Sequence, residues 1–141
     1  MLAAANKGHA DICSLLLAHG SNVNEVKPGS KQTALYYAAV HGHNASIETL
    51  LSWGAEVNTQ DHAGFTPLQA ACQEGHLVSV LTLLKAGASI TLPGPGGTVA
   101  IHIAAYHNKV EVVRALLEHG CHPDMVRYYD EMMSKREYLY V

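Results

Sequence analysis

The fold is decided by the stretch Asp61-His62-Ala63-Gly64-Phe65-Thr66-Pro67-Leu68-Gln69-Ala70-Ala71-Cys72-Gln73-Glu74-Gly75-His76. The Thr66 hydroxyl can cap the start of a helix, and Pro67 suits the first helical turn, where its missing N–H costs nothing. Gly75 supplies the left-handed conformation in which many helices end. The stretch therefore predicts a short helix that begins after Thr66 and ends at Gly75.

A second helix is predicted directly after the first, from about Leu77 to Ala86, and Gly87 ends it in the same way. Val80, Leu83 and Leu84 recur at helical spacing and give this helix one apolar stripe. A single helix pair of this kind cannot bury its own apolar face, so we expect several pairs to stack against one another.

The landmarks of this helix pair recur along the chain every 33 or 34 residues. A Leu-Leu pair followed three residues later by glycine occurs four times, and a Gly-His pair occurs three times, with its fourth slot taken by Asn108-Lys109. The Leu-Leu pairs are Leu16-Leu17, Leu50-Leu51, Leu83-Leu84 and Leu116-Leu117, and the Gly-His pairs are Gly8-His9, Gly42-His43 and Gly75-His76. Because three landmarks keep one period, the sequence predicts a repeat protein.

Over about residues 1–124 the pattern resembles the ankyrin repeat. The resemblance is carried by Thr66-Pro67-Leu68, by Gly54-Ala55 with Val57-Asn58, by the alanine pairs Ala38-Ala39 and Ala104-Ala105, and by the Gly-His and Leu-Leu pairs. It implies an all-α fold, an ankyrin-repeat solenoid of helix-turn-helix units joined by hairpin loops, with about three and a half repeats and a C-terminal tail. The expected repeats span about residues 1–28, 29–61, 62–94 and 95–124.

Departures from the repeat predict local irregularities. Val99 cannot cap a helix, although Thr98 lies beside it, and Asn108 stands where a left-handed glycine is expected. The segment Val26–Gln32 has one extra residue, and the loop Leu92–Gly97 is expected to be the least regular. Because the first unit begins at its first helix, we expect the chain to be a monomeric fragment, isoform or partial gene model of a longer array.

The C-terminal tail, residues 125–141, does not continue the repeat. Its apolar and aromatic residues include Tyr128, Tyr129, Met132 and Met133, which follow helical spacing. We predict a helix that covers the last repeat, and the alternative is a flexible end.

Composition excludes several classes of protein. The net charge is -3 and no block of Lys or Arg exists, so nucleic acid is not an expected partner. The longest apolar runs fall far short of the roughly 20 residues that cross a bilayer, so no direct membrane insertion is expected. The first residues, Met1-Leu2-Ala3-Ala4-Ala5-Asn6-Lys7, lack the basic-then-apolar design of a signal peptide, so none is expected. The three cysteines, Cys13, Cys72 and Cys121, are far apart in sequence, which favours buried free thiols and an intracellular, cytoplasmic location.

No pattern of catalytic or cofactor-binding residues was found, so we expect no enzyme activity, no cofactor and no metal site. The cluster His119-Gly120-Cys121-His122 lacks the paired spacing of a zinc site, and Gly94–Gly97 has prolines where a phosphate loop needs N–H groups. Asp61 and His62 are adjacent and cannot form a triad geometry. The resemblance implies structural roles for His9, His43, His76 and His102, which would hydrogen-bond to the backbone.

The resemblance also implies that a partner protein binds the concave surface formed by hairpin tips and first helices. The predicted partner-binding residues are Tyr37, Val40, His41, His62, Phe65, Gln73, Glu74, Tyr106 and His107. Aromatic side chains dominate binding hot spots, so Tyr37, Phe65 and Tyr106 are the expected anchors of a largely neutral, part-apolar partner. The competing interpretation of Phe65 is that it packs on the next repeat.

Three functions compete. The first is a general protein-interaction module. The second is a substrate-recognition segment of a SOCS-box-type ubiquitin ligase adaptor. Its basis is that the departures from Thr-Pro-Leu-His and the cysteine-containing helices are similar to those of some members of that family. No SOCS box is recognisable in the tail. The third is a spacer in a membrane-cytoskeleton linker, for which these repeats are too divergent and too few.

Overall fold

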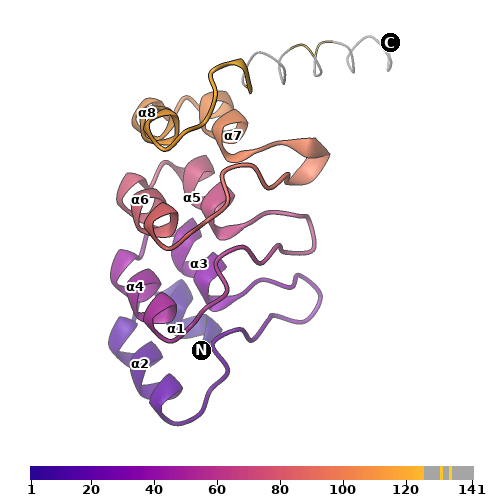
Figure 1. Cartoon of the computed structure of the whole chain (residues 1–141). Coiled ribbons are helices and arrows are strands. Elements are labelled where there is room, and N and C mark those ends of the chain that lie inside the picture. The colour runs from indigo at the N-terminus through magenta and orange to yellow at the C-terminus, as the bar shows by residue number, and fades with distance from the viewer. Residues whose placement is uncertain (126–130, 132–133, 135–141) are drawn as a thin grey trace.

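The computed structural model describes residues 1–125, Glu131 and Ser134, and the described chain is a stack of four helix pairs (Figure 1). One layer contains the first helices of the pairs, α1 (Leu2–Asn6), α3 (Ala34–Val40), α5 (Pro67–Glu74) and α7 (Ala100–Tyr106). The other layer contains the second helices, α2 (Ala10–Ala18), α4 (Asn44–Ser52), α6 (Leu77–Lys85) and α8 (Val110–Glu118). Each helix contacts its counterpart in the next pair, so the predicted all-α solenoid is confirmed for these residues.

The core runs through the stack as one continuous cluster. Leu50, Leu83 and Leu116 are each 0% exposed and lie in that cluster, as the repeat period predicts. Burying a leucine side chain contributes about 2 kcal/mol. Leu84, the other predicted member of the α6 stripe, is only half-buried and packs against the edge of the cluster.

The start of α5 follows the prediction from Thr66 and Pro67. The Thr66 hydroxyl accepts a hydrogen bond from the Gln69 backbone N–H at 3.2 Å, and the Gln69 side-chain oxygen accepts one from the Thr66 N–H at 3.1 Å. This reciprocal pair is a capping box, and Pro67 occupies the first turn. Gly75 ends the helix at φ 77°. The local sequence thus fixes both ends of α5.

Replacing Thr66 by valine should lower the free energy of unfolding by about 1 kcal/mol, because the hydroxyl that accepts from the buried Gln69 N–H is lost while the side-chain shape is kept. Urea unfolding followed by circular dichroism measures the change. Thr66→Ser retains the acceptor and is the control. A serine variant as unstable as the valine variant would contradict the capping role.

The start of α7 lacks this cap. The Val99 side chain has no atom that can accept a capping hydrogen bond, as predicted. The neighbouring Thr98 hydroxyl does not cap the helix either, because it donates to the Pro95 carbonyl at 2.8 Å. The other half of the box is present, because the Val99 N–H donates to Nδ1 of His102 at 3.2 Å. The imidazole of His102 therefore takes the place that the Gln69 amide has in α5.

Three hairpins connect the pairs, and each is closed by a backbone hydrogen bond. The closing bonds are Lys27 N–H to Gln32 O at 2.8 Å, Asp61 N–H to Phe65 O at 2.9 Å and Gly94 N–H to Thr98 O at 2.6 Å. The extra residue of the first hairpin lies inside the closed tip, where Lys31 adopts φ 57°. The third hairpin, expected to be the least regular, contains a short 3₁₀ turn, η1 (Pro95–Gly97).

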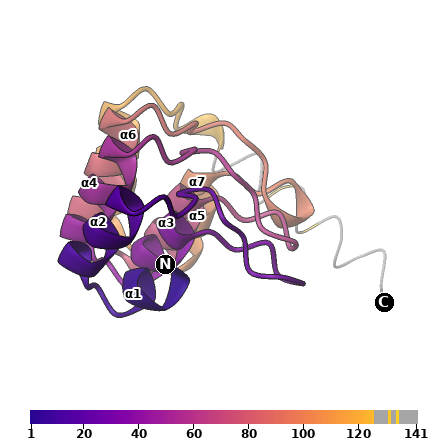
Figure 2. The ribbon, with the colours of Figure 1, turned by 90° about the horizontal axis from the view of Figure 1, so that it is seen from below.

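The hairpins also contact one another. The His62 N–H donates to the Ser30 carbonyl at 2.8 Å, and the Gln60 side-chain amide donates to the Pro93 carbonyl at 2.9 Å. Figure 2 shows the hairpins extending together to one side of the two helix layers. They therefore form a continuous wall beside the first helices.

The Gly-His pairs join neighbouring units. Nε2 of His43 donates to the Asn6 carbonyl at 3.1 Å, and Nε2 of His76 donates to the Val40 carbonyl at 2.9 Å. These bonds confirm the structural role expected of both histidines. The ring of His9 forms no hydrogen bond with the described part of the chain, so for this residue the expectation is not met.

The fourth unit fills the Gly-His slot differently. Asn108 adopts φ 57°, as predicted for a residue that replaces a left-handed glycine. Lys109 takes the position of the histidine, and its aliphatic chain lies against Gly75 of the preceding unit. A lysine stem thus covers the same turn that an imidazole covers in the second and third units.

The predicted tail helix, in residues 125–141, falls almost wholly outside the described residues. Met125, Glu131 and Ser134 are the members of this segment that the structure describes. The division into repeats and tail therefore stays a prediction.

Candidate functional site

The inner surface is the name used here for the face formed by α1, α3, α5, α7 and the hairpins at 27–32, 61–65 and 94–98. The outer surface is formed by α2, α4, α6 and α8. The predicted partner-binding residues come from the elements of the inner surface. The exposed side chains of Trp53 and Val78 lie at the end of α4 and on α6, and therefore belong to the outer surface.

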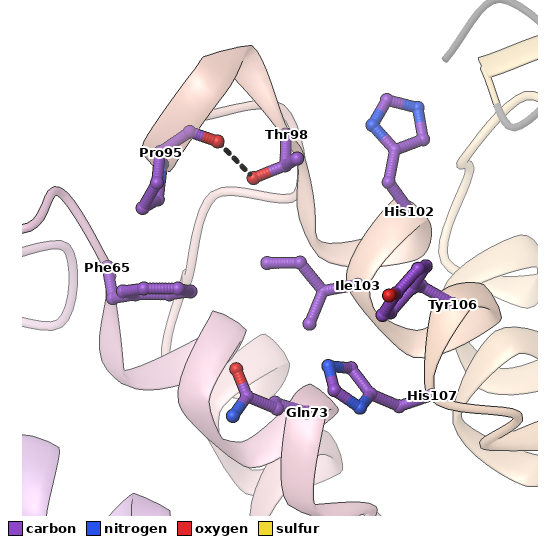
Figure 3. A pocket seen from close by; sticks show the side chains of 8 residues that line it. All are labelled: Phe65, Gln73, Pro95, Thr98, His102, Ile103, Tyr106 and His107. Carbon is purple, nitrogen blue, oxygen red and sulfur yellow. Dashed lines mark hydrogen bonds between the residues drawn. The ribbon is translucent and has the colours of Figure 1, made fainter. Parts of the chain in front are cut away.

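A cavity of about 170 Å³ opens on the C-terminal half of the inner surface. Its lining comes from the last two hairpins, α5 and α7, and comprises Phe65, Gln73, Pro95, Thr98, His102, Ile103, Tyr106 and His107 (Figure 3). Four predicted partner-binding residues therefore lie together: Phe65, Gln73, Tyr106 and His107. Sequence reasoning missed His102 as a lining residue because it treated this histidine only as a structural group.

The cavity combines apolar walls with a largely exposed aromatic side chain. In Figure 3 the ring of Phe65 faces Ile103 across the hollow, and Tyr106 lies on the far side of Ile103. Tyr106 is 81% exposed, and its ring meets that of His107 edge-on at 5.2 Å between centroids. Phe65 is half-buried, so the packing role and the binding role weighed for it are compatible.

A second hollow, of about 360 Å³, lies on the N-terminal half of the inner surface. It is lined by Leu2, Ala3, Asn6, Lys27 and Tyr37. Asn6 and Gln73 each lie two residues before the glycine of the Gly-His pair, in units one and three, so the two hollows have corresponding places in the stack. Tyr37 therefore lies apart from Phe65 and Tyr106 and does not share their cavity.

The remaining predicted residues line neither hollow. Val40 is half-buried and offers its carbonyl to His76. His41 is exposed and hydrogen-bonds through Nε2 to the Asn6 side chain at 2.8 Å. His62 is exposed at a hairpin tip, and Glu74 is exposed at the last position of α5. These four are available at the rim of the surface and do not form a pocket of their own.

Asp61 positions Phe65. One carboxylate oxygen of Asp61 accepts from the N–H groups of Ala63 at 3.0 Å and Phe65 at 2.9 Å. The other accepts from the Gln32 side-chain amide of the preceding hairpin at 3.3 Å. The carboxylate is therefore used to shape the hairpin that carries Phe65.

The third residue of α5 and the third residue of α7 tie each helix to the loop that follows the next helix. The Gln69 amide donates to the Leu92 carbonyl at 2.8 Å, and Nε2 of His102 donates to the Met125 carbonyl; both links span 23 residues. Sequence reasoning did not find these links. The available signal was that Gln69 and His102 are 33 residues apart and can both donate and accept.

The three cysteines are free and buried. Burial, together with the nearby Cys121 thiol, raises the pKa of Cys72 to about 12. Burial also raises the pKa values of Cys13 and Cys121. The thiols therefore stay neutral and pack as small apolar groups. Within the described residues, no three His, Cys, Asp or Glu side chains are grouped so that they could hold a metal ion.

The sequence of the repeats matches a known family of proteins. The profile of a family described as ankyrin repeats (3 copies) matches residues 1–61 and 54–127. None of the described helices is both long and apolar enough to cross a membrane.

Several curated proteins resemble about half of the chain. The chain is 44% identical over 69 residues to the probable E3 ubiquitin-protein ligase XBOS33 of Oryza sativa. The matched segment covers 48% of this chain and 13% of that protein. It is 39% identical over 64 residues to protein HOS4 of Saccharomyces cerevisiae, covering 45% of this chain and 6% of that protein. It is 39% identical over 62 residues to the neurogenic locus Notch protein of Drosophila melanogaster, and this segment covers 44% of this chain and 2% of that protein. The matched segments are thus small parts of these relatives.

Proposed function

Since the chain belongs to the ankyrin-repeat family, we propose that it is a protein-interaction module whose partner protein binds the inner surface. The single observation that carries the proposal is the cavity of about 170 Å³ beside Tyr106, whose side chain is 81% exposed. A tyrosine that is this exposed contributes little to stacking between repeats. Large aromatic side chains beside a pocket are the usual centres of protein–protein binding energy.

The proposed binding residues fall into anchors and rim. Phe65 and Tyr106 are the anchors, because both line the cavity and are its large aromatic side chains. Gln73 and His107 lie at its edge and can give directional hydrogen bonds. Tyr37 anchors the N-terminal half of the partner in the second hollow. The rim residues Val40, His41, His62 and Glu74 complete the surface.

Alanine at Tyr37, Phe65 and Tyr106 together should weaken binding of the partner at least tenfold, because three aromatic contacts are removed from the two hollows. The partner is first obtained by affinity capture with the intact chain, and Kd values are then compared by calorimetry. Circular dichroism checks that the variant is folded.

The matched control replaces Trp53 and Val78 by alanine. Both side chains are exposed, at 46% and 62%, and both belong to the outer surface, so the control removes apolar surface without touching either hollow. Unchanged Kd in the control with a weakened triple variant is the expected result. A folded triple variant that binds as tightly as the intact chain would exclude the inner surface as the site.

The alternative function is substrate recognition for a SOCS-box-type ubiquitin ligase adaptor. It is favoured by the 44% identity to a protein named as a probable E3 ubiquitin-protein ligase, although the match covers 13% of that protein. The test is whether the captured partner becomes ubiquitylated in cells that express the longest transcript containing this array. A partner that binds but is never ubiquitylated leaves the general interaction module as the function.

An intracellular, cytoplasmic location also belongs to the proposal. It is supported by three buried cysteines that form no disulfide, as is usual in a reducing compartment.

A further inference from the structure

We infer that the segment bound on the inner surface is an extended acidic peptide with one apolar side chain, whose acidic part lies over the N-terminal half of that surface. This inference rests on the proposed function and specifies the chemistry of the partner, and it replaces the sequence-based expectation of a largely neutral partner with an acidic one. It is carried by an unequal distribution of charge and of apolar surface along the stack.

The N-terminal half of the inner surface is positively charged. In α1 and its C-cap, in α3 and in the hairpin at 27–32, every charged side chain is a lysine: Lys7, Lys27 and Lys31. All three are exposed, and Lys27 also lines the hollow of about 360 Å³. Within the described residues, none of these lysines forms an ion pair with a carboxylate. They are therefore available to a negatively charged ligand.

The acidic residues near these lysines do not cancel their charge on the inner surface. Glu25 lies two residues before Lys27, outside the closed hairpin. Asp61 is on the neighbouring hairpin, where its oxygens accept three hydrogen bonds from Ala63, Phe65 and Gln32. A carboxylate of the partner placed over this hairpin would have two lysines available in one loop, so their attractions would act together.

The C-terminal half of the inner surface selects for apolar rather than acidic groups. The cavity of about 170 Å³ is walled by Phe65, Ile103 and Tyr106. Cavities of roughly 150 Å³ hold a group the size of benzene, so this one has room for a single apolar side chain. Glu74, exposed at the end of α5, offsets the charge of Lys109, whose side chain lies against Gly75, so this half carries no excess of positive charge to attract a carboxylate. The two halves therefore give the bound segment a direction.

The spacing of the two hollows sets the spacing of the two features in the peptide. They lie two units apart in the stack, and packed helices are about 10 Å apart, so the hollows are roughly 20 Å apart. An extended chain advances about 3.3 Å per residue, so about six residues separate the apolar side chain from the acidic residue.

A synthetic peptide array tests this inference with the full chain as the soluble probe. Each twelve-residue peptide has one fixed leucine and carries aspartate, asparagine or lysine at one other position. Peptides with aspartate about six positions from the leucine should bind at least tenfold more tightly than their lysine counterparts. The preference should weaken at high salt, because exposed charges are screened.

The matched variants are Lys27→Glu and Lys85→Glu. Both change the net charge equally, but Lys85 is exposed in the last turn of α6, on the outer surface. The Lys27 variant should abolish most of the preference for aspartate, because the new carboxylate offsets Lys31 in the same hairpin, whereas the Lys85 variant should leave the preference unchanged. The inference is overturned by no binding to any peptide, by no preference for aspartate, or by equal effects of the two variants.

The proposed function is judged separately by the triple alanine variant and its captured partner. If that variant loses its partner while the array shows no acidic preference, the inner surface is the site and only the peptide chemistry is wrong. If the triple variant keeps its partner, the proposed function itself fails.

Discussion

Replacing Leu83 by alanine is expected to lower the free energy of unfolding by about 2–5 kcal/mol, the range for large-to-small changes in a close-packed core. Leu83 is 0% exposed and lies in the continuous cluster that joins all four units. Its helix, α6, packs against α4 on one side and α8 on the other, so the lost methyl groups weaken two interfaces. Urea unfolding monitored by far-ultraviolet circular dichroism measures the loss.

Leu81→Ala is the control in the same helix. Leu81 is 40% exposed, so its truncation removes less buried surface and should cost less than about 1 kcal/mol. Equal losses in the two variants would mean that the repeated leucine pair does not define the interior. Such a result would remove the physical basis of the stacked fold.

Replacing Gly42 by alanine should cost about 2–4 kcal/mol. Gly42 adopts φ 68°, which costs an L-residue about 1–2 kcal/mol. A Cβ atom at this position would also lie 2.6 Å from Nδ1 of His76, so the imidazole would have to move. Nε2 of that ring holds the Val40 carbonyl, and the movement would break the link between two units. The loss is again read from urea unfolding.

Gly87→Ala separates the two causes. Gly87 has φ 90°, but no heavy atom lies within 4 Å of its added Cβ, so only the backbone cost of about 1–2 kcal/mol should appear. Adding His76→Ala to Gly42→Ala should recover part of the larger loss, because the clashing ring is gone. If Gly42→Ala and Gly87→Ala cost the same, the His76 ring does not constrain the turn.

The fold could be predicted because its determinants are local and repeated. Thr66 and Pro67 start α5, and Gly75 ends it. The period of the leucine pairs predicts which helix faces pack against one another. Repetition makes each such signal appear several times, so one irregular unit does not hide it. The helix ends differ from the prediction by one residue at α6, which ends at Lys85.

The candidate site could be predicted only in part. The spacing placed Phe65, Gln73, Tyr106 and His107 on one surface, and these four do line one cavity. The sequence did not reveal that Tyr37 lies in a different hollow, because depth depends on the side chains of neighbouring units. The sequence also showed no sign of the hydrogen bond from His102 to the Met125 carbonyl, because the acceptor is a backbone atom, which every residue has.

The backbone bond at the base of each hairpin separates the length of the tip from the arrangement of the helices. The tip closed by Lys27 and Gln32 holds one residue more than the tip closed by Asp61 and Phe65, yet α3 and α5 stack in the same way as their neighbours. The helix stack therefore tolerates an added residue in one tip, although the tips themselves stay joined by hydrogen bonds such as that from the His62 N–H to the Ser30 carbonyl. Because tip length is separated from the arrangement of the helices, these tips are suitable places for grafting foreign recognition sequences in protein engineering.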